Sequence, residues 1–103
     1  MKVKWTPLAK KQWKATGRYI LKMYGKQTKD AFMQEVYQTG QLLSNQPYLG
    51  ITEPYLADHP LEYRSIVVNR LNKIVYRIEG ETIRIVAFWD TRREPKKQAE
   101  QMK

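Results

Sequence analysis

The chain has 103 residues, a mass of 12.3 kDa, a formal net charge of +9 and no cysteine. This length predicts one domain over residues 1–103, and a content of 42% hydrophobic residues suffices for one modest core. The lack of cysteine excludes a disulfide scaffold, a thiolate zinc site or a cysteine nucleophile, and a single histidine, His59, argues against a transition-metal site built from protein ligands alone. Neither a stretch of about 18 apolar residues nor the apolar core of a secretory signal is present. We therefore expect a cytoplasmic, basic, globular domain with no membrane segment and no cofactor.

The positive charge is concentrated toward the N-terminus. Residues 1–29 contain nine Lys or Arg and no acidic residue, and the first acid is Asp30. A field of one sign accelerates encounters with polyanions and makes binding sensitive to salt. The charge therefore predicts an acidic partner, either a nucleic acid or an acidic protein.

The N-terminal third predicts a strand followed by a helix. Residues 2–5 alternate polar and apolar, which is typical of a strand. Thr6 before Pro7 is a helix-start signal, and Gly25 is suited to end the helix. Between them, one face recurs at spacings of four and three residues, and it consists of Ala9, Trp13, Thr16, Ile20 and Met23.

A second helix is expected from about Thr28, with Phe32, Val36, Thr39 and Leu43 on one face. The short connection makes the two helices an antiparallel hairpin. Gly40 lies inside this helix, where glycine costs about 1 kcal/mol relative to alanine. We therefore expect a close approach of another element at Gly40.

The C-terminal half predicts an antiparallel meander. Residues 47–60 form an ordered loop, and residues 63–68, 73–78 and 82–89 are rich in β-branched and aromatic side chains. Residues 91–103 are polar and have room for one short helix. The predicted fold is α+β, with the N-terminal strand and the two-helix hairpin packed on one face of a four-stranded, mainly antiparallel sheet. The opposite face is expected to be open.

Cations follow the predicted strands. Alternation in residues 73–78 places Ile74, Tyr76 and Ile78 toward the helices and Lys73 and Arg77 on the other face. We expect the cations to converge on that face as a phosphate-binding or partner-binding surface, in which arginine forks hold two oxygens each. Trp89 is the one tryptophan expected to lie open beside them, while Trp5 and Trp13 belong to the core. The candidate site residues, the cations together with this tryptophan, are Arg64, Lys73, Arg77, Arg84, Trp89, Arg92 and Arg93.

Two segments in this order resemble the RelE/ParE family, the toxins of type II toxin–antitoxin pairs. They are KIVYRI, residues 73–78, and FWDTRREP, residues 88–95, and the predicted order of elements agrees with the family fold over nearly the whole chain. The resemblance implies a protein that inhibits growth and is neutralised by a cognate acidic antitoxin, which folds on binding.

RelE-like members of the family cleave mRNA in the ribosomal A site, where the ribose 2′-OH attacks the adjacent phosphate. By this resemblance Arg64, Lys73 and Arg92 are the candidate catalytic residues, which clamp the phosphate and stabilise the developing charge. Many such nucleases also carry a Tyr or His near the C-terminus, and this chain has neither after Trp89. The candidate replacements in the loop are Glu53, His59, Glu62 and Tyr63.

ParE-like members instead inhibit DNA gyrase and need no catalytic residues. In that case the basic surface and the C-terminal segment form a protein contact, and Arg92 and Arg93 become binding residues. The sequence favours ribosome-dependent mRNA cleavage slightly and keeps gyrase inhibition as the alternative. A small basic RNA-binding domain without toxicity is a second alternative.

Overall fold

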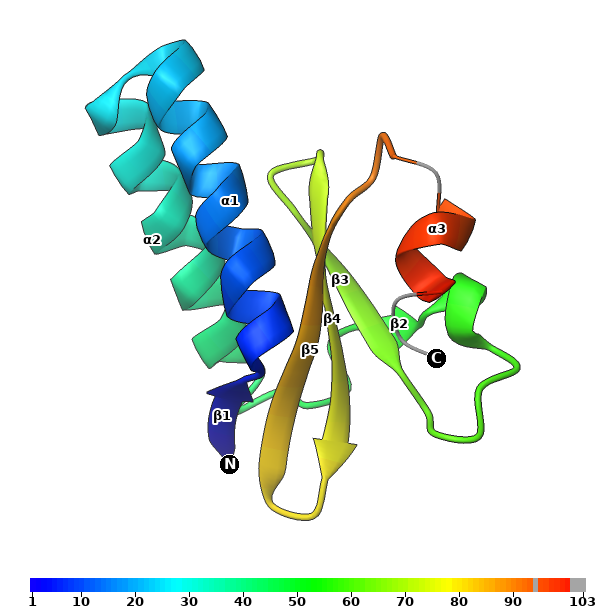
Figure 1. Cartoon of the computed structure of the whole chain (residues 1–103). Coiled ribbons are helices and arrows are strands. Elements are labelled where there is room, and N and C mark those ends of the chain that lie inside the picture. The colour runs from blue at the N-terminus through cyan, green and yellow to red at the C-terminus, as the bar shows by residue number, and fades with distance from the viewer. Residues whose placement is uncertain (94, 101–103) are drawn as a thin grey trace.

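A two-helix hairpin packed on a mixed β-sheet makes up most of the fold (Figure 1). The computed structural model describes residues 1–93 and 95–100, except for the side chains of residues 95 and 96. Within these residues no helix has the length and apolar character that crossing a bilayer requires. The elements in chain order are β1 (Lys2–Trp5), α1 (Pro7–Tyr24), α2 (Lys26–Leu42), β2 (Ile51–Thr52), the 3₁₀ turn η1 (Pro54–Leu56), β3 (Arg64–Val68), β4 (Asn72–Glu79), β5 (Thr82–Asp90) and α3 (Pro95–Glu100).

The sheet confirms the α+β class with one strand more than predicted. Its order is β1-β5-β4-β3-β2, with β1 parallel to β5 and all other pairs antiparallel. The additional strand, β2, lies in residues 47–60, which were predicted to be a loop. Only Ile51 and Thr52 pair with β3. Two residues are too few to produce a recognisable alternation in the sequence.

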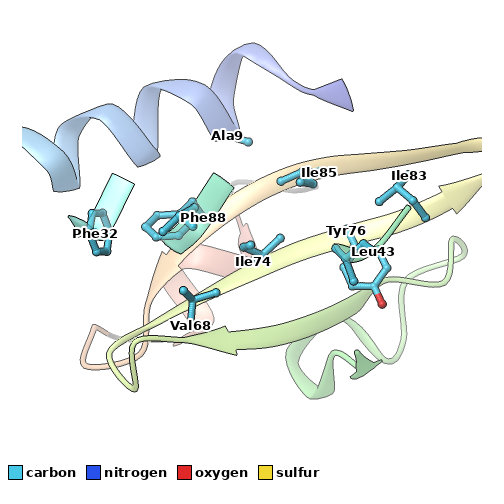
Figure 2. Packing of buried hydrophobic residues seen from close by; sticks show 10 residues of the cluster. Ala9, Phe32, Leu43, Val68, Ile74, Tyr76, Ile83, Ile85 and Phe88 are labelled. Carbon is cyan, nitrogen blue, oxygen red and sulfur yellow. The ribbon is translucent and has the colours of Figure 1, made fainter. Parts of the chain in front are cut away.

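The main core lies between the hairpin and the sheet (Figure 2). The predicted helix start is confirmed, since the Thr6 hydroxyl accepts a hydrogen bond from the Ala9 backbone N–H over 3.2 Å. Phe32 of α2 meets Phe88 of β5 edge to face, with ring centroids 6.0 Å apart. The buried members are Ala9, Phe32, Val36, Leu43, Val68, Ile74, Tyr76, Ile83, Ile85 and Phe88.

The close approach expected at Gly40 is confirmed. A Cβ atom added there would lie 3.3 Å from Cδ1 of Ile85 and 3.6 Å from the ring of Trp5. Glycine therefore lets α2 lie directly on β1 and β5, and this contact offsets its poor helix propensity. Trp5 and Trp13 are stacked with centroids 4.8 Å apart and pack against the core, as predicted.

The expectation that the other face of the sheet is open is wrong for the half that lies beneath α3 and η1. These elements lie across the sheet from the hairpin and close a second small core (Figure 1). Its members are Leu56, Tyr63, Val75, Val86, Ala87, Trp89 and Ala99.

A β-bulge in β5 makes this second core possible. Val75 pairs with Ala87 and Tyr76 pairs with Ile85, so Val86 has no partner in β4. The extra residue reverses the alternation, so that Phe88 faces the helices while Ala87 and Trp89 face away from them. Simple alternation from Ile85 would have placed Trp89 in the main core.

Candidate functional site

The sheet separates the two strand residues predicted to be catalytic. Arg64 pairs with Tyr76 and therefore lies on the helix side of the sheet, at the start of β3. Lys73 pairs with Trp89, whose side chain belongs to the second core on the opposite side. The expectation that the cations converge on one face is therefore wrong for Arg64. Its side chain leaves β3 on the same side as those of Ile66 and Val68, which pack in the main core.

Arg64 holds the loop before β2 in place. Its Nη1 donates a hydrogen bond to the Gly50 carbonyl over 2.7 Å, and its Nη2 lies 3.2 Å from Oε1 of Glu62. The guanidinium carbon is 4.8 Å from the centroid of the Tyr48 ring, a cation–π distance. Tyr76 assists from the next strand, because its hydroxyl accepts from the Gly50 N–H over 3.0 Å. Both terminal nitrogens of Arg64 thus have partners within the fold, while its Nε is buried without one in the described residues.

Lys73 neutralises a buried carboxylate. Glu53 is 0% exposed, and the Lys73 ammonium contacts both of its oxygens, with Oε2 at 2.7 Å. Ser65 donates a further hydrogen bond to Oε2 over 3.3 Å. The ammonium also lies 5.5 Å from the ring centroid of Tyr55 and 5.3 Å from that of Trp89. Lys73 and Glu53 therefore form a buried pair enclosed by aromatic rings, with 16% of the lysine side chain exposed.

The sequence named Glu53 only as a replacement acid or base. Its role as the buried partner of Lys73 depends on residues 53 and 73 meeting across β3, which no local pattern reveals. His59, the other loop candidate, accepts a hydrogen bond from the Leu61 N–H at Nδ1 over 3.1 Å and packs edge to face on Tyr63. No group of three His, Asp or Glu side chains in the part of the chain that the structure describes is placed to hold a metal ion.

The expectation that Trp89 lies open is wrong. The side chain is 1% exposed, because the β-bulge turns it into the second core beneath α3 and η1. Neither face of its ring is available to stack on a nucleotide or a partner.

Arg77 and Arg84 do share the predicted face. They pair across β4 and β5, and both contact the Glu79 carboxylate, with Arg84 at 3.2 and 3.3 Å. The hydrogen bond from Arg84, helped by the charge of Arg77, lowers the pKa of Glu79 below its ordinary value. Lys4 of β1 pairs with Arg84 and continues this surface. We call Lys2, Lys4, Arg77 and Arg84 the distal sheet cations.

Arg92 and Arg93 lie at the mouth of a cleft between α1 and the end of β5. The cleft has a volume of about 520 Å³. Arg92 is 59% exposed and forms a forked pair with Asp90, at 3.2 and 3.1 Å. Lys11 is the cation of the opposite wall. The lining residues are Leu8, Lys11, Gln12, Ala15, Thr16, Tyr19, Phe88, Asp90, Arg92, Arg93 and Gln98.

Two glutamines complete the edge of β5 that β1 leaves unpaired. The Phe88 N–H donates to Oε1 of Gln12 over 2.8 Å. Gln98 pairs with Asp90 as a strand would, since it accepts from the backbone N–H and donates to the carbonyl, each over 3.0 Å. The sequence contained no signal for either residue, because a glutamine on a polar helix face is ordinary.

The Asp90 carboxylate makes the stability of the fold depend on pH in the acidic range. Burial acts to raise its pKa, but the hydrogen bonds and charge of Arg92 outweigh burial, and the pKa lies below its ordinary value. The carboxylate therefore stabilises the fold above its unfolded pKa of about 3.9, and this contribution is lost as the pH falls through the lower folded-state pKa. In urea unfolding we expect the wild type to have a larger free energy of unfolding than Asp90→Asn at about pH 7, and this difference to shrink toward about pH 2. A difference independent of pH would contradict this assignment.

The comparisons with known proteins agree with the fold. Residues 3–95 match the family model described as ParE toxin of type II toxin–antitoxin system, parDE. A chain in a solved structure of the chromosomal ParDE TA system from P. aeruginosa has a TM-score of 0.73 at 20% identity, over 87% of this chain and 95% of that one. A comparison with curated proteins gave no significant match.

Proposed function

We propose that this chain, which belongs to the ParE toxin family of type II toxin–antitoxin systems, stops growth by binding DNA gyrase. In this proposal the chain does not cut mRNA. A cognate acidic antitoxin would neutralise it, as the family implies. From the sequence alone, mRNA cleavage was slightly favoured over gyrase inhibition, and the proposal made here is the opposite.

The observation that carries the choice is the separation of Arg64 from Lys73. A 2′-OH attack on phosphate needs cations and an acid–base pair around one phosphate. Arg64 lies on the helix side of the sheet and Lys73 on the other, and each is engaged with a carboxylate and with backbone or aromatic groups. Neither is free to receive a phosphate, which supports a binding mechanism over a catalytic one.

The C-terminal end of the sheet offers a surface for a protein contact. Arg92 and Arg93 are exposed there, and Asp90 orients the Arg92 guanidinium. Arginine is enriched among binding hot spots, and the adjoining cleft offers both apolar and polar side chains to a partner. We assign Arg92 and Arg93 to the gyrase contact.

Two reactions test the mechanism side by side. The purified chain is added to a gyrase supercoiling reaction and to a translating ribosome reaction with defined mRNA. We expect loss of supercoiling and no A-site cleavage. Arg92→Ala with Arg93→Ala is expected to weaken gyrase inhibition by about tenfold or more, as for truncated arginine hot spots.

Arg77→Ala with Arg84→Ala is the matched control, since it removes the same charge from the distal sheet face. This variant should inhibit gyrase as the wild type does. Cleaved mRNA with unaffected supercoiling would overturn the proposed mechanism and return Arg64, Lys73 and Arg92 to a catalytic role.

A further inference from the structure

We propose that the outer face of α1 binds the phosphate backbone of duplex DNA, so that the toxin touches the DNA held by its gyrase target as well as the enzyme. The choice of duplex DNA rests on the proposed function, because gyrase acts on duplex DNA. The surface consists of Lys10, Lys14, Arg18 and Lys22, which we call the α1 basic stripe.

The stripe winds gradually around the exposed side of α1. Its residues are four positions apart, so each lies close to the next on the helix surface and is turned about 40° from it. At 1.5 Å per residue, the stripe places one cation about every 6 Å over about 18 Å. All four residues are exposed to solvent, and the core face of α1, which contains Ala9, points away from them. Duplex DNA carries one negative charge per about 1.7 Å of its axis, so flexible cationic side chains spread over this length can contact several phosphates.

The stripe is a continuous run of cations without acidic partners in the described residues, a lack that Lys2, Lys4 and Lys11 share singly. Each cation of β3, β4 and β5 is paired with a carboxylate: Arg64 with Glu62, Lys73 with Glu53, and Arg77 and Arg84 with Glu79. At the start of α2, Lys26 and Lys29 pair with Asp30 at 2.7 and 3.6 Å. None of the four stripe residues has an ion pair or hydrogen bond from its side chain to any residue in the described ranges 1–93 and 95–100.

This arrangement does not serve the stability of the helix. The stripe contains three like-charge pairs at a spacing of four residues, and such pairs destabilise a helix. Lys22 in the last turn complements the helix dipole, but α1 contains no acidic residue that could offset the repulsion within the stripe. A row of like charges kept at this cost supports a binding role for them.

The side chains of the stripe favour a nucleic-acid backbone over a protein or a single strand. Three of the four are lysines, which act as point charges toward phosphates but are depleted in protein–protein interfaces. Single-strand binding needs aromatic rings on which bases stack. Trp13 packs against the core, Tyr19 lines the cleft beside β5, and Tyr24 is the last residue of α1. None of the three therefore lies between the stripe cations.

Fluorescence anisotropy with the full chain and no gyrase tests the proposal. The probes are a 20-base-pair duplex DNA (about two helical turns), the RNA duplex of the same sequence, and polyglutamate. The variant Lys10→Gln, Lys14→Gln, Arg18→Gln, Lys22→Gln is compared with Lys2→Gln, Lys4→Gln, Arg77→Gln, Arg84→Gln, which removes the same charge from the distal sheet cations. Both variants are first checked by circular dichroism and thermal unfolding.

We expect the stripe variant to bind duplex DNA at least about tenfold more weakly at low salt, while the distal variant stays close to the wild type. Loss of four phosphate contacts should also reduce the slope of log K against log salt by about 3 to 4. Equal weakening in both variants, or tighter binding of the RNA duplex or of polyglutamate than of DNA, overturns the proposal.

The two proposals fail in different ways. If gyrase is inhibited but the stripe variant binds DNA as the wild type does, the DNA-binding surface is wrong and the proposed function stands. If DNA binding depends on the stripe but gyrase is unaffected, the surface stands and the proposed target is wrong.

Discussion

Replacing Lys73 with alanine is expected to lower the free energy of unfolding by about 3 to 5 kcal/mol, because the change leaves the Glu53 carboxylate buried without its cation. Glu53 is 0% exposed, and its other side-chain partner is the Ser65 hydroxyl, which cannot compensate a full charge. The loss is a large part of the stability of a small domain, so the variant should unfold at a clearly lower urea concentration than the wild type. Urea unfolding followed by circular dichroism measures it.

A double variant separates this structural role from a catalytic one. Lys73→Met with Glu53→Leu removes both charges and keeps side chains of similar volume, and such replacements of buried pairs are often neutral or stabilising. We expect it to fold and to arrest growth when induced without an antitoxin. A well-folded double variant without toxicity would instead support a chemical role for Lys73. Replacing both Arg64 and Lys73 with alanine does not test catalysis separately from stability, because it removes the contacts of Arg64 with Gly50 and Glu62 and the ion pair of Lys73 with Glu53.

Replacing Gly50 with alanine is expected to destabilise the fold by about 2 to 3 kcal/mol through overpacking. A Cβ atom there would lie 2.6 Å from the Ser65 carbonyl oxygen and 2.8 Å from the Tyr76 ring. Both atoms belong to the buried interior of the sheet, so neither can move aside without cost. The backbone at Gly50 also binds the Arg64 guanidinium and the Tyr76 hydroxyl. Thermal and urea unfolding measure the effect.

Gly80→Ala is the matched control for this substitution. Gly80 has a positive φ of 60° at the turn between β4 and β5, and no atom lies within 4 Å of an added Cβ. The substitution should therefore cost only the left-handed backbone strain, about 1 kcal/mol. A Gly50→Ala variant no less stable than Gly80→Ala would mean that the loop before β2 is not held against β3 and β4 as described.

The helices and long strands were predictable because their signals are local. The Thr6 and Pro7 start, the apolar spacing from Ala9 to Ile20 and the alternation in residues 73–78 all depend on residues close in sequence. The same holds for the family, because the match to the ParE toxin model follows the chain from residue 3 to residue 95.

The placement of the candidate site depended on the tertiary structure. One extra residue at Val86 reverses the face on which Trp89 lies, and a bulge of one residue has no distinct sequence signal. That Arg64 and Lys73 lie on opposite faces of the sheet likewise follows from the register of β3 on β4.

The sequence by itself therefore determined the fold class, the family and the basic character of α1, since these arise from short-range patterns and total charge. Only the tertiary structure decided which cations are free. The carboxylates of Glu53, Glu79 and Asp90 neutralise four cations of β4, β5 and the turn after β5, which are Lys73, Arg77, Arg84 and Arg92. The α1 basic stripe has no such partner in the described part of the chain. The physical reason is that an ion pair depends on distance in space, which residue order specifies only after the chain has folded.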